Sequence, residues 1–185
     1  MKQNERYRDN KMILKNGQEL HIRKAEKKDA TELIEFLNTV SGESDNLLFG
    51  AGEFSLTVWQ EEQFIQNMNS SLNSALFVGL TDGRIVCVGS VSTPGNRRIS
   101  HQTEIAVSVL KEFWGIGVGK CLMNEIINFA RTNKLEILHL GVKEDNIRAI
   151  ELYNKLGFTK IGVYPKFFKI NGQYYDQILM NLYLT

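Results

Sequence analysis

Three glycines at alternating positions, between a strand-like run and a helical pattern, constrain this chain most. Residues 105–110 read Ile-Ala-Val-Ser-Val-Leu, and such an apolar, β-branched run favours a buried strand. Gly115, Gly117 and Gly119 follow, and apolar residues then recur at helical spacing over 120–132. The sequence therefore predicts a strand that passes through a glycine loop into a helix.

A glycine loop that opens a helix is suited to binding phosphate. The first N–H groups of a helix have no partner inside the helix, and the helix dipole adds partial positive charge there. Glycine also lets a ligand approach the backbone closely, because no side chain stands in the way. Together these features predict a phosphate or diphosphate cradle over residues 115–120.

Two common phosphate loops fit this stretch poorly. A Walker A loop needs Ser or Thr after its Gly-Lys pair, whereas Cys121 follows here and Trp114 stands where the first glycine belongs. A dinucleotide fingerprint needs Gly-x-Gly-x-x-Gly, but the spacing is Gly-x-Gly-x-Gly, and no acidic residue closes the strand predicted at 137–142. Nucleotide binding through this loop stays open as a less favoured interpretation.

The loop resembles the acetyl-CoA pyrophosphate loop of the GNAT N-acetyltransferase superfamily. It departs from the family at Trp114, where Arg or Gln is usual. The resemblance implies that the loop holds the pyrophosphate and that the preceding strand pairs with the pantetheine arm, with the Val107 N–H polarising the carbonyl oxygen. The cofactor-binding residues implied here are Val107, Ser108, Val109, Trp114, Gly115, Ile116, Gly117, Val118, Gly119 and Lys120.

A second motif strengthens the resemblance. Residues 146–158 closely resemble the GNAT pattern Asn-x-x-Ala-x-x-Leu-Tyr-x-x-x-Gly-Phe. Asn146 and Tyr153 are separated by about two helical turns, so we expect them on one helix face. By the resemblance, Asn146 contacts the CoA arm, and Tyr153 is the catalytic acid that protonates the departing thiolate. Taken singly, Asn146 would more simply be a residue at a helix start, and Tyr153 would more simply be a core aromatic.

Glu104 is the second catalytic candidate, as the base that takes a proton from the amine. It lies in the predicted strand just before the coenzyme-binding run, where carboxylates serve as base, often through water, in some relatives. The competing interpretation is a structural carboxylate that pairs with a neighbouring strand. His101 lies three positions earlier and would face the opposite side of a regular strand.

Length and composition fit one folded domain. The chain has 185 residues, a 43% hydrophobic fraction and a net charge of +1. It is therefore long enough for a sizeable core, and neither nucleic acid nor an acidic membrane is implied as a partner. No run approaches the ~18 apolar residues of a membrane span, and residues 1–11 have no signal-peptide core. We therefore expect a cytoplasmic location.

The cysteines and histidines carry no metal-binding pattern. Cys87 and Cys121 are far apart in the chain and fit reduced core thiols better than a disulfide. The three histidines are scattered singly and lack ligand spacing. We therefore expect no metal, with acetyl-CoA as the co-substrate that the resemblance implies.

The predicted element order is βααβββαβαββ, and the strands and helices are expected at the ranges given next. Strands are predicted at 19–24, 75–80, 84–92, 98–110, 137–142, 158–163 and 174–184, and helices at 31–40, 57–69, 120–132 and 147–156. Residues 1–12 are expected to form an N-terminal leader and residues 13–185 the domain. The resemblance implies an α+β, single-domain GNAT fold: a mixed, mainly antiparallel sheet flanked by helices and splayed between its two central strands.

Two regions bear on the acceptor: loop 41–56 and the tail 167–176. Loop 41–56 carries several acidic residues, and in the family such a loop builds the acceptor pocket. These acids could hold a cationic amine, or the loop could simply be solvated. The tail 167–176 resembles that of the bacterial spermidine and ribosomal-protein acetyltransferase branches, which does not fix a substrate.

We therefore expect an enzyme, an acetyl-CoA-dependent N-acetyltransferase that transfers acetyl to a primary amine by direct attack. The acceptor is a small amine, an amino-acid derivative or a protein N-terminus. The alternative is a non-catalytic acyl-CoA-binding regulatory module. Exposed C-terminal strands could also pair two copies into a homodimer.

Overall fold

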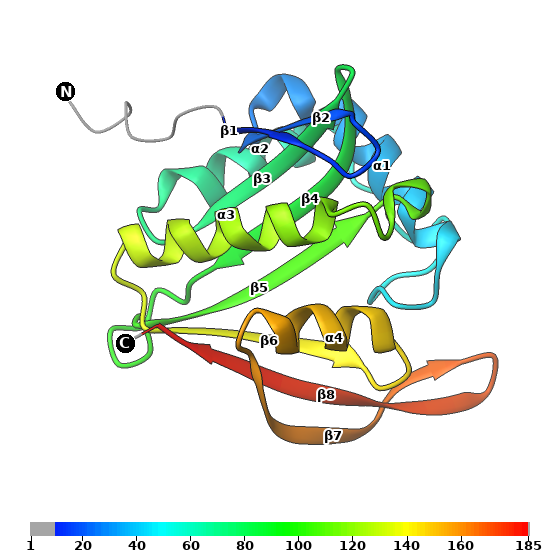
Figure 1. Cartoon of the computed structure of the whole chain (residues 1–185), viewed down its shortest axis with the longest axis vertical. Helices are drawn as coiled ribbons and strands as arrows, with labels where there is room; N and C mark the ends of the chain where they lie inside the picture. The colour runs from blue at the N-terminus through cyan, green and yellow to red at the C-terminus, as the bar shows by residue number, and fades with distance from the viewer. Residues whose placement is uncertain (1–9, 185) are drawn as a thin grey trace.

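The computed structural model describes residues 10–184, which form one eight-stranded sheet flanked by helices (Figure 1). The strands are β1 (Asn10–Ile13), β2 (Glu19–Lys24), β3 (Ala75–Thr81), β4 (Arg84–Ser92), β5 (Gln102–Val109), β6 (Ile137–Lys143), β7 (Thr159–Ile170) and β8 (Gln173–Tyr183). The helices are α1 (Ala30–Glu43), α2 (Val58–Ser70), α3 (Val118–Thr132) and α4 (Ile147–Lys155), with short 3-10 helices η1 (Lys27–Asp29) and η2 (Lys111–Phe113).

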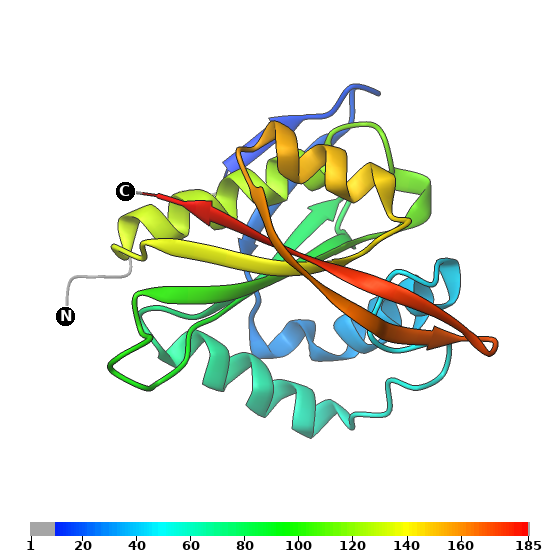
Figure 2. The same cartoon turned by 90° about the horizontal axis from the view of Figure 1, so that it is seen from below.

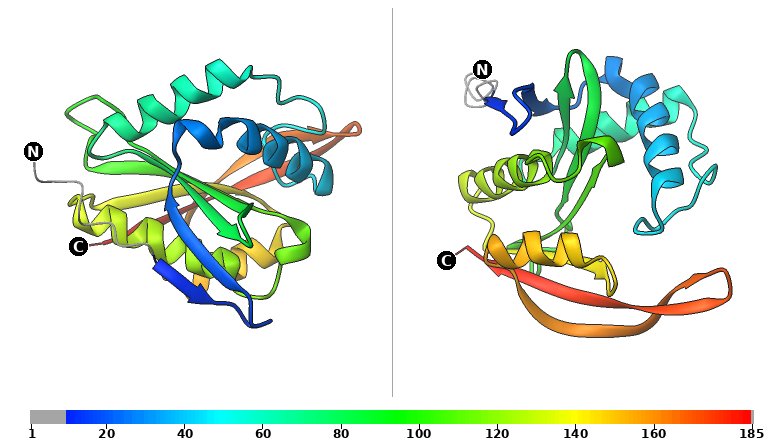
Figure 3. Two further views of the ribbon diagram at one scale, coloured as in Figure 1. Left: turned by 90° about the horizontal axis from the view of Figure 1, so that it is seen from above. Right: turned by 45° about the vertical axis from the view of Figure 1, so that its right-hand side comes forward.

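The sheet has the order β1-β2-β3-β4-β5-β6-β8-β7. Within the described chain, β5 and β6 are the one parallel pair, and all other neighbours are antiparallel. Helices α1 and α2 cover one face, and α3 and α4 cover the other (Figures 2 and 3). The predicted mixed, mainly antiparallel sheet flanked by helices is confirmed.

Helix α3 packs closely on the central strands. A Cβ on Gly89 of β4 would lie 2.9 Å from the Ile126 side chain, so the strand and the helix can approach only because this residue has no side chain. Phe77 of β3 meets Phe129 of α3 edge to face, with ring centroids 5.6 Å apart. The central strands are thus buried on both faces, which explains the continuous apolar runs in β3 and β4.

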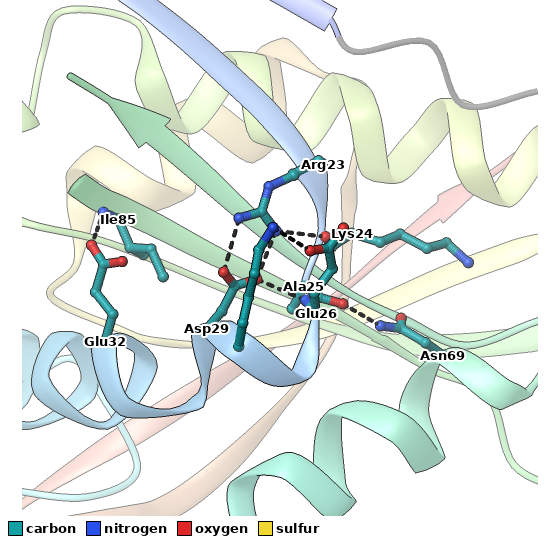
Figure 4. Close-up of polar contacts among 9 residues, drawn as sticks. Arg23, Lys24, Ala25, Glu26, Asp29, Glu32, Asn69 and Ile85 are labelled. Atoms are coloured by element: carbon teal, nitrogen blue, oxygen red, sulfur yellow. Dashed lines mark hydrogen bonds and ion pairs between the residues drawn. The ribbon is translucent and has the colours of Figure 1, made fainter. Parts of the chain in front are cut away.

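A network of polar side chains joins β2 to α1 and α2 (Figure 4). The Asp29 carboxylate accepts two hydrogen bonds from Arg23, at 2.6 and 2.9 Å, and one from the Glu26 N–H at 2.7 Å. Burial alone would raise the pKa of Asp29, but these hydrogen bonds and the charges of Arg23 and Lys28 together lower it. Asn69 ties the end of α2 to the sheet, donating to the Ala25 carbonyl at 2.8 Å.

The structure differs from the sequence prediction at three strands. Strand β7 runs to Ile170, seven residues beyond the end predicted at 163. Strand β1 was not predicted; it forms a hairpin with β2, so positions 10–12 of the expected leader lie in the sheet, while 1–9 fall outside the described residues. The strand predicted at 98–110 begins only at Gln102, because the polar stretch before it turns: the Ile99 N–H donates to the Asn96 carbonyl. The predicted helices are present, and none of their ends is shifted by more than three residues.

The sheet opens between β5 and β6, as predicted. The two strands pair at three positions, from Gln102 opposite Ile137 to Glu104 opposite His139. Beyond that point their ribbons diverge (Figure 1). The facing edges of β5 and β6 therefore carry backbone groups that do not pair with each other, and this splay places the site described next.

Candidate active site

The register of β5 on β4 fixes which backbone groups point into the splay. The Leu110 N–H donates to the Val86 carbonyl at 3.0 Å. Because hydrogen-bonded and non-hydrogen-bonded positions alternate along an antiparallel pair, Ser108 also bonds to β4. Val107 and Val109 then direct their N–H and C=O groups away from β4, toward β6. Two of the three residues predicted from this run, Val107 and Val109, thus present their backbone groups to the splay. The backbone groups of Ser108 point to β4 instead.

Trp114 is held against β5 by its indole group. Its Nε1–H donates to the Val109 carbonyl at 2.7 Å, so one of the carbonyls that point into the splay is already bonded within the protein. The Val107 N–H and C=O and the Val109 N–H remain for a ligand. The guanidinium of Arg148, in the first turn of α4, lies 4.9 Å from the centre of the Trp114 ring. Trp114 therefore links β5 to α4.

The glycine loop leaves the start of α3 open. Gly115 and Gly117 have φ of +81° and +109°, a region that favours glycine, and Gly117 is the N-cap of α3. A glycine has no side chain to bond the first N–H groups of the helix, so those of residues 118–120 stay available. The Lys15 N–H donates to the Ile116 carbonyl at 3.1 Å and fixes the loop from the β1–β2 hairpin.

Gly119 is the second residue of α3, and the helix does not start at Lys120 as predicted. A Cβ there would lie 3.3 Å from Leu152 of α4 and 3.9 Å from Val109. The small residue thus lets the start of α3, α4 and the splay edge of β5 meet. Lys120 is exposed in the same turn, beside the open N–H groups.

Helix α4 brings Asn146 and Tyr153 to this junction. Asn146 is the N-cap, and its Oδ1 accepts from the Ala149 N–H at 3.3 Å, which leaves its Nδ2 for other contacts. Tyr153 is 7% exposed and its ring packs on Phe158 at 5.7 Å, while no residue within 10–184 bonds to its hydroxyl. Burial raises the pKa of Tyr153 to about 12, so it is a neutral phenol at physiological pH.

Glu104, the second catalytic candidate, lies on the face of the sheet opposite to α4 and Tyr153. Glu104 is exposed and lies opposite Ser92 of β4, so its side chain is on the same face as Ala106 and Ser108. His101 lies in the turn before β5, where its carbonyl accepts from the Glu136 N–H at 2.8 Å. The structure therefore places Glu104 on the face covered by α1 and α2, and His101 outside the strand.

A cavity of about 350 Å³ lies on that face, between the sheet and helices α1 and α2. Its walls come from both helices, from β3 to β5 and from the loop before α2. The lining residues are Leu33, Leu37, Leu47, Leu48, Phe49, Phe54, Leu56, Glu61, Phe64, Leu76, Val88, Ser90, Ala106, Val107 and Ser108. The cavity thus adjoins the β5 residues whose backbone points into the splay.

Glu61 was not recognised as a site residue from the sequence. It is 2% exposed and lines the cavity. Its Oε2 is buried without a hydrogen-bond partner within residues 10–184, and burial raises the pKa of its carboxyl. Glu61 lies one turn before the buried Ile65, so an acidic residue on the apolar stripe of α2 was the available signal.

Two of the three acidic residues of loop 41–56 accept hydrogen bonds from backbone N–H groups. The Glu43 carboxylate accepts from the Lys111 N–H at 2.7 Å, and that of Glu53 accepts from the Gly50 N–H at 2.9 Å. Neither lines the cavity, and the loop contributes Leu47, Phe49 and Phe54 to it instead. The surface that this loop offers to an acceptor is therefore mainly apolar.

The described part of the chain has neither a metal-binding cluster nor a membrane-spanning helix. Residues 10–184 contain no group of three or more His, Cys, Asp or Glu side chains placed to hold a metal ion. None of their helices has the length and hydropathy to cross a membrane.

Comparisons with known proteins agree with this geometry. The model of a family described as "Acetyltransferase (GNAT) family" matches residues 45–158, more than half of the chain. The N-alpha-acetyltransferase RimI of Mycobacterium tuberculosis is 26% identical over 115 residues, which are 62% of this chain and 70% of that protein.

Solved structures share the whole architecture. A GNAT-family acetyltransferase from Streptococcus pneumoniae superposes with a TM-score of 0.87 at 31% identity, covering 89% of this chain and 99% of that one. A putative acetyltransferase from Salmonella typhimurium, solved with acetyl-CoA, superposes with a TM-score of 0.79 at 21% identity, covering 90% and 94%. The overall architecture is thus that of a known fold.

Proposed function

This chain belongs to the GNAT family and is an acetyl-CoA-dependent N-acetyltransferase, and on this premise we propose how its residues divide the work. The splay between β5 and β6 carries the proposal, because its backbone groups are the missing partners of an extended ligand arm. Val107 and Val109 hold the pantetheine arm, and the N–H groups of 115–120 hold the diphosphate. Acetyl-CoA supplies a thioester whose acyl group the amine attacks directly.

Val107 and Tyr153 act on the two ends of the bond that breaks. The Val107 N–H donates to the carbonyl oxygen, where negative charge develops as the amine attacks. Tyr153 lies on α4, and its neighbour Leu152 contacts Gly119 at the start of α3. The Tyr153 hydroxyl is free to donate to the departing sulfur. Because its pKa is about 12, against about 8.5 for a thiol, Tyr153 stabilises the thiolate chiefly as a hydrogen-bond donor.

Glu104 is the proposed base. An ammonium group of pKa about 10 must lose a proton before its nitrogen can attack. Glu104 lies on the cavity face of β5, two residues from Ala106 in the cavity wall, so roughly 7 Å separates the two positions along the strand. That separation suits transfer through one water molecule, after which Glu104 passes the proton to solvent.

Thiol release with a panel of amines tests this proposal. The wild-type protein should release CoA from acetyl-CoA in the presence of a suitable primary amine, and Tyr153→Phe should bind acetyl-CoA normally but turn over far more slowly. Tight acetyl-CoA binding with no turnover by either protein would instead support a non-catalytic acyl-CoA-binding module.

We also propose a cytoplasmic enzyme that forms homodimers. Cys87 and Cys121 are both free, as is usual for proteins of a reducing compartment. Strand β7 is the outer strand beside β8, and it exposes Ile161, Val163 and Tyr164, which could pair with a second copy. Light scattering of the purified protein tests the dimer, and charged substitutions at Val163 and Tyr164 should return it to a monomer.

A further inference from the structure

The cavity beneath α1 and α2 combines hydrocarbon walls with a single charged side chain. Among its lining residues, Glu61 alone is ionisable, and Ser90 and Ser108 are the other polar side chains. The remaining walls are leucine, phenylalanine, valine and alanine. A volume of about 350 Å³ is within the range of small-molecule sites. The cavity therefore suits a ligand with a compact apolar body and one group that complements a carboxylate.

Glu61 has no evident structural task. The start of α2 is already capped by the pair Thr57 and Gln60: the Gln60 N–H donates to the Thr57 hydroxyl at 3.3 Å, and the Thr57 N–H donates to the Gln60 side chain at 2.8 Å. Glu61 also makes no ion pair or side-chain hydrogen bond within residues 10–184. A buried carboxyl oxygen without a partner destabilises a protein, so a ligand is the simplest reason to keep one.

We propose that this cavity binds the body of the acceptor and selects primary amines that carry a compact hydrocarbon group, with Glu61 binding the acceptor's ammonium before Glu104 takes up its proton. The inference rests on the proposed acetyltransferase function and names the class of amine that it uses. Apolar walls favour burial of the hydrocarbon body but disfavour a bare charge. Glu61 offsets that cost by forming a charge-assisted hydrogen bond inside the cavity.

The same walls exclude other amines. A polyamine such as spermidine would bring additional ammonium groups into a space where Glu61 is the one acidic lining residue. A small polar amine such as ethanolamine would pair with Glu61 but leave the apolar walls unfilled. The structure therefore predicts that 2-phenylethylamine binds more tightly than either ethanolamine or spermidine.

Calorimetric binding in the presence of CoA, which prevents turnover, tests the role of Glu61. The probes are 2-phenylethylamine and its uncharged analogue 2-phenylethanol, and the variants are Glu61→Gln and the control Glu62→Gln. Glu62 is the next residue of α2 and does not line the cavity. Glu61→Gln should weaken 2-phenylethylamine about tenfold or more and leave 2-phenylethanol unchanged. Glu62→Gln should change neither.

A second variant tests the cavity itself. Ser90→Leu places a larger side chain into the wall formed by β4, so it should abolish 2-phenylethylamine binding while acetyl-CoA still binds. The melting temperature of Glu61→Gln should stay unchanged or rise, since an unpaired buried carboxylate is removed. A clear fall would show that Glu61 holds the fold and would overturn the inference.

Two other results would also overturn it: wild-type affinity of Glu61→Gln for 2-phenylethylamine, or equal or tighter binding of ethanolamine or spermidine by the wild type. Turnover is a separate readout. If 2-phenylethylamine binds as expected but no CoA is released from acetyl-CoA, the proposed enzymatic roles fail and the amine site stands.

Discussion

The two proposed ligand sites of this protein are built by different means. On the coenzyme side, the groups that we propose for binding belong mainly to the backbone: the free edge of β5 and the open N–H groups at the start of α3. On the acceptor side, side chains of α1, α2 and the loop before α2 enclose a cavity around Glu61. A backbone-built site suits a constant ligand, whereas a side-chain-built cavity can change its ligand with single substitutions.

The largest expected effect is on the rate of the chemical step, with ligand binding left unchanged. Tyr153→Phe keeps the buried ring and removes the hydroxyl that we propose donates to the sulfur. We expect kcat to fall about 100-fold or more with unchanged acetyl-CoA affinity. Steady-state kinetics and calorimetry measure the two quantities. Tyr174→Phe, in the exposed turn region of the β7–β8 hairpin, is the control, and near wild-type kcat in Tyr153→Phe would refute this role.

The next effect tests whether the coenzyme site depends on backbone conformation. Gly117 has φ of +109° at the start of α3, which disfavours a β-branched residue. Gly117→Val should weaken acetyl-CoA binding about 10- to 100-fold. Gly172→Val introduces similar strain at φ of +83° in the β7–β8 turn, so it should lower stability without changing coenzyme affinity. Equal affinities in both variants would contradict a backbone-built cradle.

The Arg23–Asp29 network at the start of α1 should affect the acceptor cavity only through the stability of the fold. Asp29→Asn removes the partner of the half-buried Arg23, and we expect a loss of about 2 kcal/mol in the free energy of unfolding. Because the folded-state pKa of Asp29 is lowered, its contribution is present above the unfolded pKa of about 3.9 and is lost as the pH falls through the folded value.

Chemical denaturation between pH 3 and pH 7 measures both parts of this prediction. Asp29→Asn should flatten the acid side of the profile, and the exposed Asp45→Asn should leave it unchanged. A parallel loss of stability at every pH in that range, with the acid slope kept, would show that other carboxylates cause the acid sensitivity.

A smaller effect tests a charged side chain that lies beside the proposed coenzyme site. Arg148 stacks on Trp114 beside the glycine loop, so its guanidinium is placed to replace the Arg or Gln that the family usually has at position 114. Arg148→Gln should weaken acetyl-CoA about three- to tenfold and reduce the salt dependence of binding. Arg131→Gln, at the far end of α3, is the control. An unchanged salt dependence would indicate that the backbone alone binds the phosphates.

The smallest effect concerns the wall that carries Glu61. Thr57→Ala removes one side of the capping pair of α2 and should cost about 1 kcal/mol of stability. The KM of the acceptor should rise a few-fold, at about the same free-energy cost, while that of acetyl-CoA stays constant. Thr39→Ala, on the exposed part of α1, is the control for a surface hydroxyl. A matching rise in the KM of acetyl-CoA would mean that the two sites are not separate.

The difference between the sites also explains what the sequence could predict. Gly117 and Gly119 are needed for a local conformation and a close approach, and such needs leave short motifs at fixed spacing. The helix motif with Asn146 and Tyr153 is equally local. Most of the helices and strands, and the splay that the family resemblance implied, were therefore predicted. Proposed roles of individual residues in binding and catalysis await the experiments above.

Long-range contacts could not be predicted in the same way. Glu61 resembled one more acidic residue of a helix start, because its burial depends on α1, β4 and β5, which lie far from it in the chain. Trp114 departed from the family, and only the fold shows that its indole bonds to Val109 and its ring meets Arg148. Strand β1 is four residues long and is ordered by β2 rather than by its own pattern.

The proposed binding of the coenzyme arm beside β5 would give that arm a mechanical role, because β5 and β6 pair with each other at three positions. An arm bonded to Val107 and Val109 adds rungs to the ladder, so it acts as a removable strand that fastens β6 and β8 to the rest of the sheet. Deuterium uptake by the amides of β6 should therefore slow on saturation with CoA. Release of CoA would then have to break these hydrogen bonds, so the rate of turnover would depend on how fast the sheet opens.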